Sequence, residues 1–463
     1  MSAYVPYAVI VLLLFLLASS IAGLFHRRKS VTFLINTSLF ALIAIASIAS
    51  MIYGSTYTIA GVINFNAFSE LFITLFSVSL LLINILAYRY SENHDTFSFL
   101  LALSFTGMFF ISTASSLLEI LLGFEMMALP SVFMIIGEGR SRLEAGIKLF
   151  FLGVLSITVL VFATSLLYSY NPSLSLVSMQ PLQGTIPYLL VLAIILFIAS
   201  LGVETALFPF NLWVPDVYQG APGFITAMLA GINKKVAFVA LLEILFIVLI
   251  PFSSTFTPIL VLLSILTMFF GNLVAMVQEN VKRMFAYSSI SQAGYILVGM
   301  AAAGSLGITA SIFQIVTHAF MIIGAFSVVM WLESRNMHTV DDYSGLFRSN
   351  GFAAVSLTLL MLSMAGIPPL MGFYGKFLLF SSAISSKLLY LAVIGIVNSF
   401  ISIYYYGRLI NSMFVKKEKR KEKMSLTVIT VVSVTLAVIL LFGIYPQPIL
   451  HLASMASAAL LPK

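Results

Sequence analysis

Hydrophobic segments of about 20 residues recur along the whole chain, and short polar loops separate them. A helix of about 20 apolar residues crosses the hydrocarbon core of a bilayer, so each segment predicts a membrane-spanning helix. The first segment is long enough to span and predicts a helix rather than a cleavable signal. The pattern predicts about fourteen spans, near residues 6–25, 31–53, 66–88, 97–113, 116–136, 143–168, 186–214, 222–250, 257–279, 283–303, 306–333, 352–382, 388–414 and 425–445.

The charges of the loops alternate from one predicted side to the other. Loops 54–65, 169–185, 251–258 and 303–307 carry no Lys or Arg, and Lys387 and the terminal Lys463 are the exceptions on that side. Because basic loops remain in the cytoplasm, both termini are expected on the outer face of the cell membrane. The basic loops carry Arg27, Arg28, Lys29, Arg89, Arg140, Arg142, Lys282, Arg283, Arg335, Arg348 and the run 416–423.

Two groups of five predicted helices suggest an internal repeat. In each group the fourth helix contains proline: Pro209 in predicted helix 7, and Pro368 and Pro369 in predicted helix 12. A tandem repeat of an odd number of spans is inverted, and transporters built this way bind ions where helices break. The predicted parts are 1–96 (three N-terminal helices), 97–250 (first repeat, helices 4–8), 251–415 (second repeat, helices 9–13) and 416–463 (basic loop, last helix and apolar tail).

The composition agrees with an all-α polytopic membrane protein. Hydrophobic residues make up 61% of the chain and charged residues 8%. The net charge of +7 lies in short loops, so it does not indicate nucleic-acid binding. The absence of cysteine excludes disulfides and cysteine-held iron–sulfur clusters from this chain, and its five histidines show no metal-ligand spacing.

Ten ionisable side chains fall inside predicted spans. Each charge at the centre of a spanning helix costs about 2.5–3.5 kcal/mol on insertion scales, so these side chains should face the bundle, pair with each other or meet water. Acids and bases are nearly balanced, which favours pairing and a proton relay. The predicted buried set is Glu119, Glu125, Lys148, Glu204, Lys234, Lys235, Glu243, His318, Lys376 and Arg408.

Several of these residues also have a purely structural interpretation. Glu119 and Arg408 lie near helix ends, where long side chains reach the interface. Lys234 and Lys235 are adjacent and point about 100° apart, so one of them is expected to face away or reach the interface.

Structural explanations also exist for ionisable residues at the centres of the spans. Glu243 could neutralise a neighbouring base, and His318 could be a structural hydrogen-bonding residue. Glu125 and Lys376 are harder to explain in that way, because each lies in an apolar stretch. Lys376 also follows the second proline break by about two turns.

Five stretches together resemble a known family. They are GFEMMALP (123–130), EAGIKLFFLG (144–153), PFNLWVPDVYQGAP (209–222), GNLVAMVQENVKRMFAYSSISQAGYILVG (271–299) and SMAGIPPLMGFYGKF (363–377). In this order and spacing they resemble the antiporter-like subunits of respiratory complex I, most closely the N-type subunit of NADH- or F420H2-quinone oxidoreductases. The resemblance covers about residues 60–415, and the sister families are Mrp-type antiporter and membrane-bound hydrogenase subunits.

The resemblance implies roles for several of the ionisable residues. Glu125 matches the acid of the fifth helix, and Lys148 matches a lysine of the sixth. Lys234 matches the lysine of the eighth helix, with Lys235 as the nearby alternative. In the second half, the matches are His318, at a central protonatable position of the eleventh helix, and Lys376, at the terminal channel base of the twelfth.

Three positions depart from the family pattern. Glu204 stands where the family usually has a lysine, and Asn211 where it usually has histidine. Glu243 stands where many relatives have arginine. Either Glu204 pairs with Lys234 in place of the usual acid–lysine pair, or the first half conducts poorly, or it carries a different ion.

Three functional hypotheses follow. The first is a proton-translocating subunit of a complex I-like quinone oxidoreductase of the respiratory chain, with quinone, iron–sulfur clusters and flavin in partner subunits and no cofactor or metal in this chain. The second is a sodium/proton antiporter subunit of the Mrp or membrane-bound hydrogenase type. The third is a scaffold that does not conduct. In the first two, the partners are other membrane subunits and the lipid bilayer.

Overall fold

The computed structural model describes residues 4–26, 28–54, 56–170, 172–176, 188–415 and 421–461. Parts of the predicted loops at 27, 169–185 and 416–423, and Lys463, therefore lie outside the described residues. The described chain is nearly all helical, which confirms the predicted fold class. It forms two compact units, each assembled from separate segments of the sequence.

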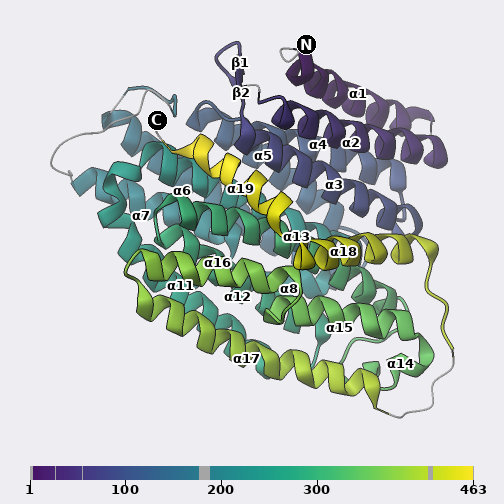
Figure 1. Cartoon of the computed structure of the whole chain (residues 1–463). Coiled ribbons are helices and arrows are strands. Elements are labelled where there is room, and N and C mark those ends of the chain that lie inside the picture. Colours follow the sequence, from purple (N-terminus) through teal and green to yellow (C-terminus); the bar gives the residue numbers. More distant parts are fainter. Residues whose placement is uncertain are drawn as a thin grey trace. The chain divides into compact units, whose positions relative to one another are not determined.

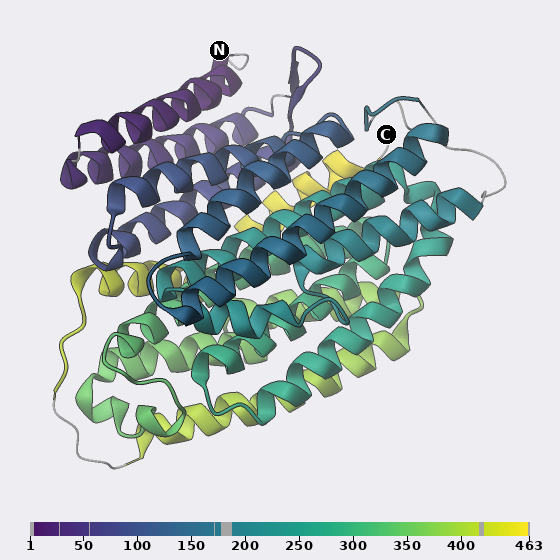
Figure 2. The ribbon, with the colours of Figure 1, turned by 180° about the vertical axis from the view of Figure 1, so that it is seen from behind.

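Unit 1 comprises Met1–Thr205, Ile232–Pro258 and Leu452–Lys463. Its helices α1 and α2 lie side by side, as do α4 and α5, and α6 and α7 (Figure 2). Its elements are α1 (Tyr4–His26), α2 (Lys29–Ile52), β1 (Tyr57–Ile59), β2 (Ile63–Phe65), α3 (Ala67–Tyr90), α4 (His94–Ser112), α5 (Leu117–Ile135), α6 (Arg140–Tyr170), α7 (Tyr188–Thr205), α10 (Lys234–Glu243), the π-helix η2 (Ile244–Val248) and the 3-10 helix η3 (Ile250–Phe252).

Unit 2 comprises Ala206–Gly231 and Ile259–His451. Helix α13 contacts α9, α12, α15, α16 and α18, and α17 runs beside α15 and α16 (Figure 1). Its helices are α8 (Trp213–Gly220), α9 (Gly223–Met228), α12 (Val281–Ala301), α13 (Ser305–Glu333), η4 (Asp341–Tyr343), α14 (Leu346–Ser349), α15 (Gly351–Ala365), α16 (Met371–Ser385), α17 (Leu389–Phe414) and α18 (Leu426–Ile444). Three elements have residues in both units: the π-helix η1 (Leu229–Asn233), α11 (Ser253–Met276) and α19 (Gln447–Leu460).

Local sequence explains where helices begin. Asn66 caps α3: its side-chain oxygen accepts from the backbone N–H groups of Phe68 and Ser69 at 2.8 and 3.0 Å. Ser69 bonds back to the Asn66 N–H at 2.8 Å, which completes a capping box. The β1–β2 hairpin precedes this cap, with Tyr57 paired to Phe65.

Both predicted helix breaks are present. α7 ends at Thr205, and the next helix starts at Trp213; α15 ends at Ala365, and α16 starts at Met371. Both breaks begin on a residue with left-handed backbone, Ala206 (φ 61°) and Gly366 (φ 90°). Since Pro209, Pro368 and Pro369 follow these residues and lack the N–H that a helix needs, neither helix continues.

Among the described residues, eleven helices are long and apolar enough to span a membrane. A twelfth candidate is the pair Asp341–Ser349 and Gly351–Ala365, bent by 119°. The count of fourteen spans, the inverted repeats and the boundaries at 97, 251 and 416 stay predictions. The apolar tail was not predicted to be helical, but it forms α19.

Candidate functional sites

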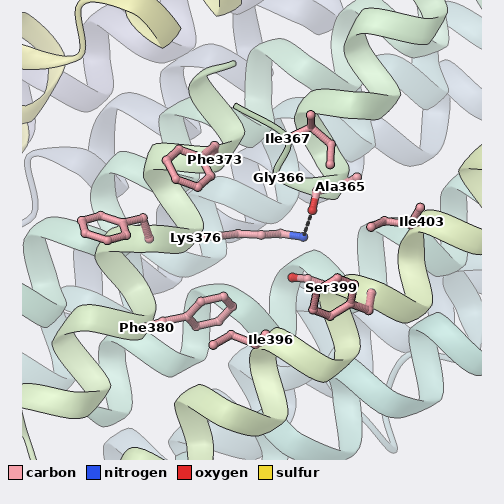
Figure 3. A pocket seen from close by; sticks show the side chains of 11 residues that line it. Ala365, Gly366, Ile367, Phe373, Lys376, Phe380, Ile396, Ser399 and Ile403 are labelled. Atoms are coloured by element: carbon pink, nitrogen blue, oxygen red, sulfur yellow. Dashed lines mark hydrogen bonds between the residues drawn. The ribbon is translucent and has the colours of Figure 1, made fainter. Parts of the chain in front are cut away.

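Lys376 is a buried lysine of unit 2. It lies in the second turn of α16, directly after the helix break, and only 4% of its side chain is exposed. Its Nζ donates a hydrogen bond to the carbonyl oxygen of Ala365 at 3.0 Å (Figure 3). On another side, Nζ lies 4.4 Å from the ring centroid of Tyr295, a cation–π distance.

The break itself provides this environment. Because α15 ends at Ala365, its last carbonyls have no partner within the helix, and one of them accepts from Lys376. A Cβ at Gly366 would lie 2.9 Å from Cδ of Lys376, and its φ of 90° also disfavours any side chain. Glycine at this position therefore leaves room for the lysine chain.

A cavity of about 350 Å³ adjoins the Lys376 side chain. Its walls are mainly aromatic and aliphatic, and two of the lining residues, Phe377 and Phe400, are 56% and 68% exposed. Figure 3 shows Phe373 and Phe380 beside Lys376, with Ser399 near its tip.

Hydroxyl and amide groups continue from Tyr295 into the unit. Asn272 of α11 is the centre of this network: its Nδ2 lies 3.4 Å from the Tyr295 hydroxyl and 3.1 Å from Oδ1 of Asn398. The Tyr405 hydroxyl donates to Oδ1 of Asn272 at 3.1 Å. These four side chains are fully buried, so their polar groups satisfy each other inside the protein.

A second polar line crosses α12 and α13. Gln314 donates to Gln292 at 3.0 Å, and Gln292 donates to the carbonyl of Met364 at 3.1 Å, in the last turn of α15. His318, one turn along α13 from Gln314, is 1% exposed. Its predicted burial is therefore confirmed.

Lys234 and Lys235 are the central bases of unit 1. They open α10, immediately after the π-helix η1, and π-helical turns are frequent at functional sites. Both residues are 1% exposed, so neither reaches the interface; that the two lysines face different ways stays a prediction. α10 packs against α4 and α7, and Asn233 just before it donates to the Ser131 hydroxyl at 2.8 Å. Because helices pack against α10 on two sides, both lysine side chains are enclosed.

Glu204 lies in the last turn of α7. Its carboxyl group hydrogen-bonds the Ser156 side chain and interacts electrostatically with Glu125. Unit 1 thus brings two acids together where the family resemblance implied an acid and a lysine. The pairing of Glu204 with Lys234 stays a prediction.

Glu243 and Glu119 also interact electrostatically. Glu243 is 3% exposed at the end of α10. Glu119 accepts the Ser116 N–H at 3.2 Å in the capping box that begins α5, so it has a clear structural role at the helix end. Glu243 therefore has an acid as its electrostatic neighbour, whereas the sequence suggested a base.

Glu125 and Lys148 are not buried, contrary to prediction. Glu125 is exposed on α5. Lys148 bonds Glu144 at 2.7 Å along the same face of α6, and their side chains are 37% and 57% exposed. Lipid and protein core are both apolar, so hydropathy does not reveal which face of a helix looks outward. Arg408 is half-buried near the end of α17, and its Nη2 donates to the carbonyl of Gln278.

The sequence analysis missed several buried polar residues. Glu70 in α3 is 1% exposed and lies near Ser50 and Ser47 of α2. The network of Asn272, Tyr295 and Tyr405 was also missed, because neutral side chains were not counted. On α17, Asn398, Ser402 and Tyr405 recur at helical period, and this polar stripe could have been found in the sequence. Within the described ranges, no group of three or more His, Cys, Asp or Glu is placed to hold a metal ion.

This chain is similar to known proteins in sequence and in architecture. The family model described as NADH:quinone oxidoreductase/Mrp antiporter, transmembrane, matches residues 114–402, more than half of the chain. The chain belongs to this family. The match spans the residues from the start of α5 to the middle of α17, including both helix breaks.

Relatives agree over nearly the whole length. The chain is 34% identical to F420H2 dehydrogenase subunit N of Methanosarcina mazei, over 88% of this chain and 87% of that protein. It is 33% identical to NADH-quinone oxidoreductase subunit N of Desulfitobacterium hafniense, over 95% of each. A chain of respiratory complex I from Thermus thermophilus superposes with a TM-score of 0.84 at 26% identity, covering 96% of this chain and 99% of that one.

A second structural likeness shows the fold alone. A chain of the Mrp complex from Dietzia sp. superposes with a TM-score of 0.92 at 20% identity, covering 99% of this chain and 97% of that one. For the function of this chain, the N-type relatives are therefore more informative than the shared antiporter fold.

Proposed function

We propose that this chain is a proton-translocating membrane subunit of a complex I-like NADH- or F420H2-quinone oxidoreductase. The observation that carries the proposal is Lys376, a buried base at a helix break with a carbonyl and an aromatic ring as its neighbours. Ionisable residues inside membrane proteins mark ion pathways and proton relays. The subunit N relatives are named as parts of F420H2 dehydrogenase and NADH-quinone oxidoreductase. The redox reaction of such a complex would drive the movement of protons.

The chain's own part is to hold and pass protons. Lys234, Lys235, Glu204 and Glu125 provide bases and acids in unit 1, and His318 and Lys376 provide them in unit 2. Lys148 and Arg408 supply further charge. Cysteine-held iron–sulfur clusters would belong to partner subunits, since this chain has no cysteine. By the relationship to subunit N proteins, we assign flavin and quinone reduction to partner subunits as well. The chain would lie in the cell membrane with both termini on the outer face.

The test is the number of protons moved per electron by the purified complex in closed vesicles. Lys376→Met keeps the volume of the side chain and removes its ammonium. We expect electron transfer to continue with a lower proton-to-electron ratio. Lys387→Met is the matched control, because Lys387 is an exposed lysine just beyond the end of α16 and should leave the ratio unchanged. An unchanged ratio in Lys376→Met would remove Lys376 from the proton path.

One observation favours a second candidate, a sodium/proton antiporter. Glu125 affects Glu204 electrostatically as a like charge, and carboxylate oxygen atoms are the ligands that hard cations prefer. This function predicts sodium-dependent proton flux without quinone reduction. Uptake of radioactive sodium by the same vesicles distinguishes the two candidates, and sodium uptake lost in Glu204→Gln would favour the antiporter.

A further inference from the structure

Glu70 is a buried acid in the N-terminal part of unit 1, outside the residues 114–402 that match the family model. It lies in the first turn of α3, and only 1% of the residue is exposed. Neither oxygen of its carboxyl group has a hydrogen-bond partner of ordinary geometry among the described residues. Because a buried carboxylate without a partner is costly, this position requires a counter-ion or a bound ligand.

Hydroxyl groups lie beside this carboxyl group. Ser50 and Ser47, in the last two turns of α2, are near it, and both are fully buried. In the part of the chain that the structure describes, the Ser47 hydroxyl has no hydrogen-bond partner, and the buried hydroxyl of Thr74 has none either. Thr74 follows Glu70 by four residues and so lies on the same face of α3. This end of the α2–α3 pair therefore collects oxygen atoms whose bonding capacity is not used.

The helices around Glu70 carry their charges at their far ends. Helix α3 contacts α2, α4 and the strand β2, and β2 has no titratable side chain. Each titratable group of the three helices, Glu70 itself excepted, is about 20 Å or more away from it along the helix axis. These groups are Lys29 of α2, Tyr88, Arg89 and Tyr90 of α3, and His94 and Asp95 of α4.

The chain segments at the near end provide no base. Residues 53–66, which include the β1–β2 hairpin, contain no Lys, Arg, His, Asp or Glu. Tyr53 and Tyr57 in this segment are exposed. The nearest charged residue of the following helix, Glu119 in the first turn of α5, is another acid. A cation that neutralises Glu70 therefore has to come from solution.

The N-terminus of α3 alone does not explain the buried acid. Its partial positive charge is about half a unit charge, and the first backbone N–H groups carry it. The Asn66 side chain already accepts from two of those groups, at Phe68 and Ser69. In the described part of α3, neither carboxyl oxygen of Glu70 bonds to any of them.

We propose that Glu70, together with Ser47 and Ser50, binds one small monovalent cation from solution, a proton or a sodium ion. Both neutralise the carboxylate, and both are held by oxygen atoms. A proton makes a neutral carboxylic acid, which donates one hydrogen bond to a hydroxyl oxygen and accepts another. A sodium ion is bound by the carboxylate and hydroxyl oxygens together, since hard cations prefer oxygen ligands. The site is additional to Lys376 and Glu204 and does not depend on their proposed role.

Labelling with dicyclohexylcarbodiimide tests the site in the purified, intact complex. This apolar reagent adds to a carboxyl group that carries a proton and takes up that proton as it adds. Mass spectrometry of this chain then measures the labelled fraction of Glu70. The pH is varied at constant salt, and in a second series sodium chloride replaces choline chloride at constant pH and ionic strength.

We expect Glu70 to be labelled, at a rate that falls about tenfold for each pH unit above the midpoint of its titration. If the bound cation is a proton alone, sodium leaves the rate unchanged. If the site takes sodium, the rate falls as sodium replaces choline, until the site is saturated. Absence of label at Glu70, or a rate that neither pH nor sodium changes, would overturn the proposal.

Glu119 in the same sample controls for burial. It is also an acid in the first turn of a helix and is 9% exposed, but its carboxylate accepts the Ser116 N–H at 3.2 Å. Because backbone donors already satisfy that carboxylate, we expect Glu119 to be labelled at least about tenfold more slowly than Glu70. Equal rates with the same dependence on pH would mean that burial alone decides the reactivity, and the proposal would be wrong.

The variant Ser47→Ala tests the hydroxyl and keeps Glu70. A hydroxyl binds a carboxylate more strongly than a neutral acid, so its loss should move the pH midpoint of labelling upward by about 0.5 or more. For a sodium site, the concentration that gives half protection should rise about threefold or more. Ser79→Ala is the matched control, because Ser79 is equally buried but lies on the opposite face of α3 from Glu70. Equal behaviour of the two variants would contradict the assignment of Ser47 to the site.

Discussion

Gly372 is the residue on which the geometry of the second helix break depends most closely. It lies in the first turn of α16, where its backbone N–H donates to the Ser363 hydroxyl at 3.1 Å. A Cβ at this position would lie 1.9 Å from the carbonyl oxygen of Ser363 in α15. The variant Gly372→Ala therefore forces α15 and α16 apart.

The size of the displacement follows from the structure. Real Cβ atoms essentially never approach another heavy atom within 3.0 Å, so the backbone must move by at least 3.0 − 1.9 = 1.1 Å. Overpacking of this kind costs about 1–3 kcal/mol of stability. The same shift would lengthen the 3.0 Å bond from Lys376 to Ala365, and an error of about 1 Å in a reacting group can cost about a hundredfold in rate.

Two assays on the purified complex measure these effects: the thermal unfolding midpoint, Tm, and the proton-to-electron ratio in vesicles. We expect Gly372→Ala to lower both. Gly407→Ala is the matched control, because a Cβ there meets nothing within 4 Å in the middle of α17. Since alanine favours a helix over glycine, the control should keep or slightly raise Tm.

A Gly372→Ala complex with the Tm and the ratio of the parent protein would refute this reasoning. That result would mean that α16 is free to shift without disturbing Lys376. A lower Tm with an unchanged ratio would keep the packing argument but separate Lys376 from pumping.

Three further predictions concern stability. Asn66→Ala removes the cap of α3 and should cost about 0.5–2 kcal/mol, measured as a lower Tm. Glu333→Ala leaves Lys282, 4% exposed, without the carboxylate at 2.7 Å; since Glu333 is 27% exposed, we expect a loss of up to about 3 kcal/mol, largely recovered in the double variant Lys282→Met with Glu333→Leu. Hydrogen bonds from the backbone N–H of Thr339, and then of His338, hold the pKa of Asp342 below its ordinary value of 3.8. Because the folded pKa lies below the unfolded one, this stabilisation is present above pH 3.8 and lost as the pH falls through the folded value, so hydrogen exchange at 338–344 should rise only below pH 3.8.

The sequence predicted the helices and their breaks well, for a clear physical reason. A spanning helix must be apolar over a fixed length, so α1 to α7 are visible as windows of hydropathy. Proline removes a backbone donor, so Pro209 and Pro368 identify the interruptions. Among the described helices, α14 and most of α8 lie between predicted spans, and α19 was missed because prolines at 446 and 448 were taken as a barrier when they allow a helix to begin there.

The candidate site was predicted less completely. The buried lysines 234, 235 and 376 were recognised because a charge in an apolar stretch is conspicuous in a sequence. The outward positions of Glu125 and Lys148 were not recognised. Lipid and the protein core both favour apolar side chains, so the sequence does not show which face of a helix is outward. The contact of Asn272 with Asn398 could not be predicted, because it joins residues 126 positions apart.

The central claim is that protons reach Lys376 inside the membrane. A map of the assembled complex that resolves ordered water tests this most directly. The account predicts ordered water at the Lys376 ammonium group. A dry, apolar surrounding at Lys376 would contradict it.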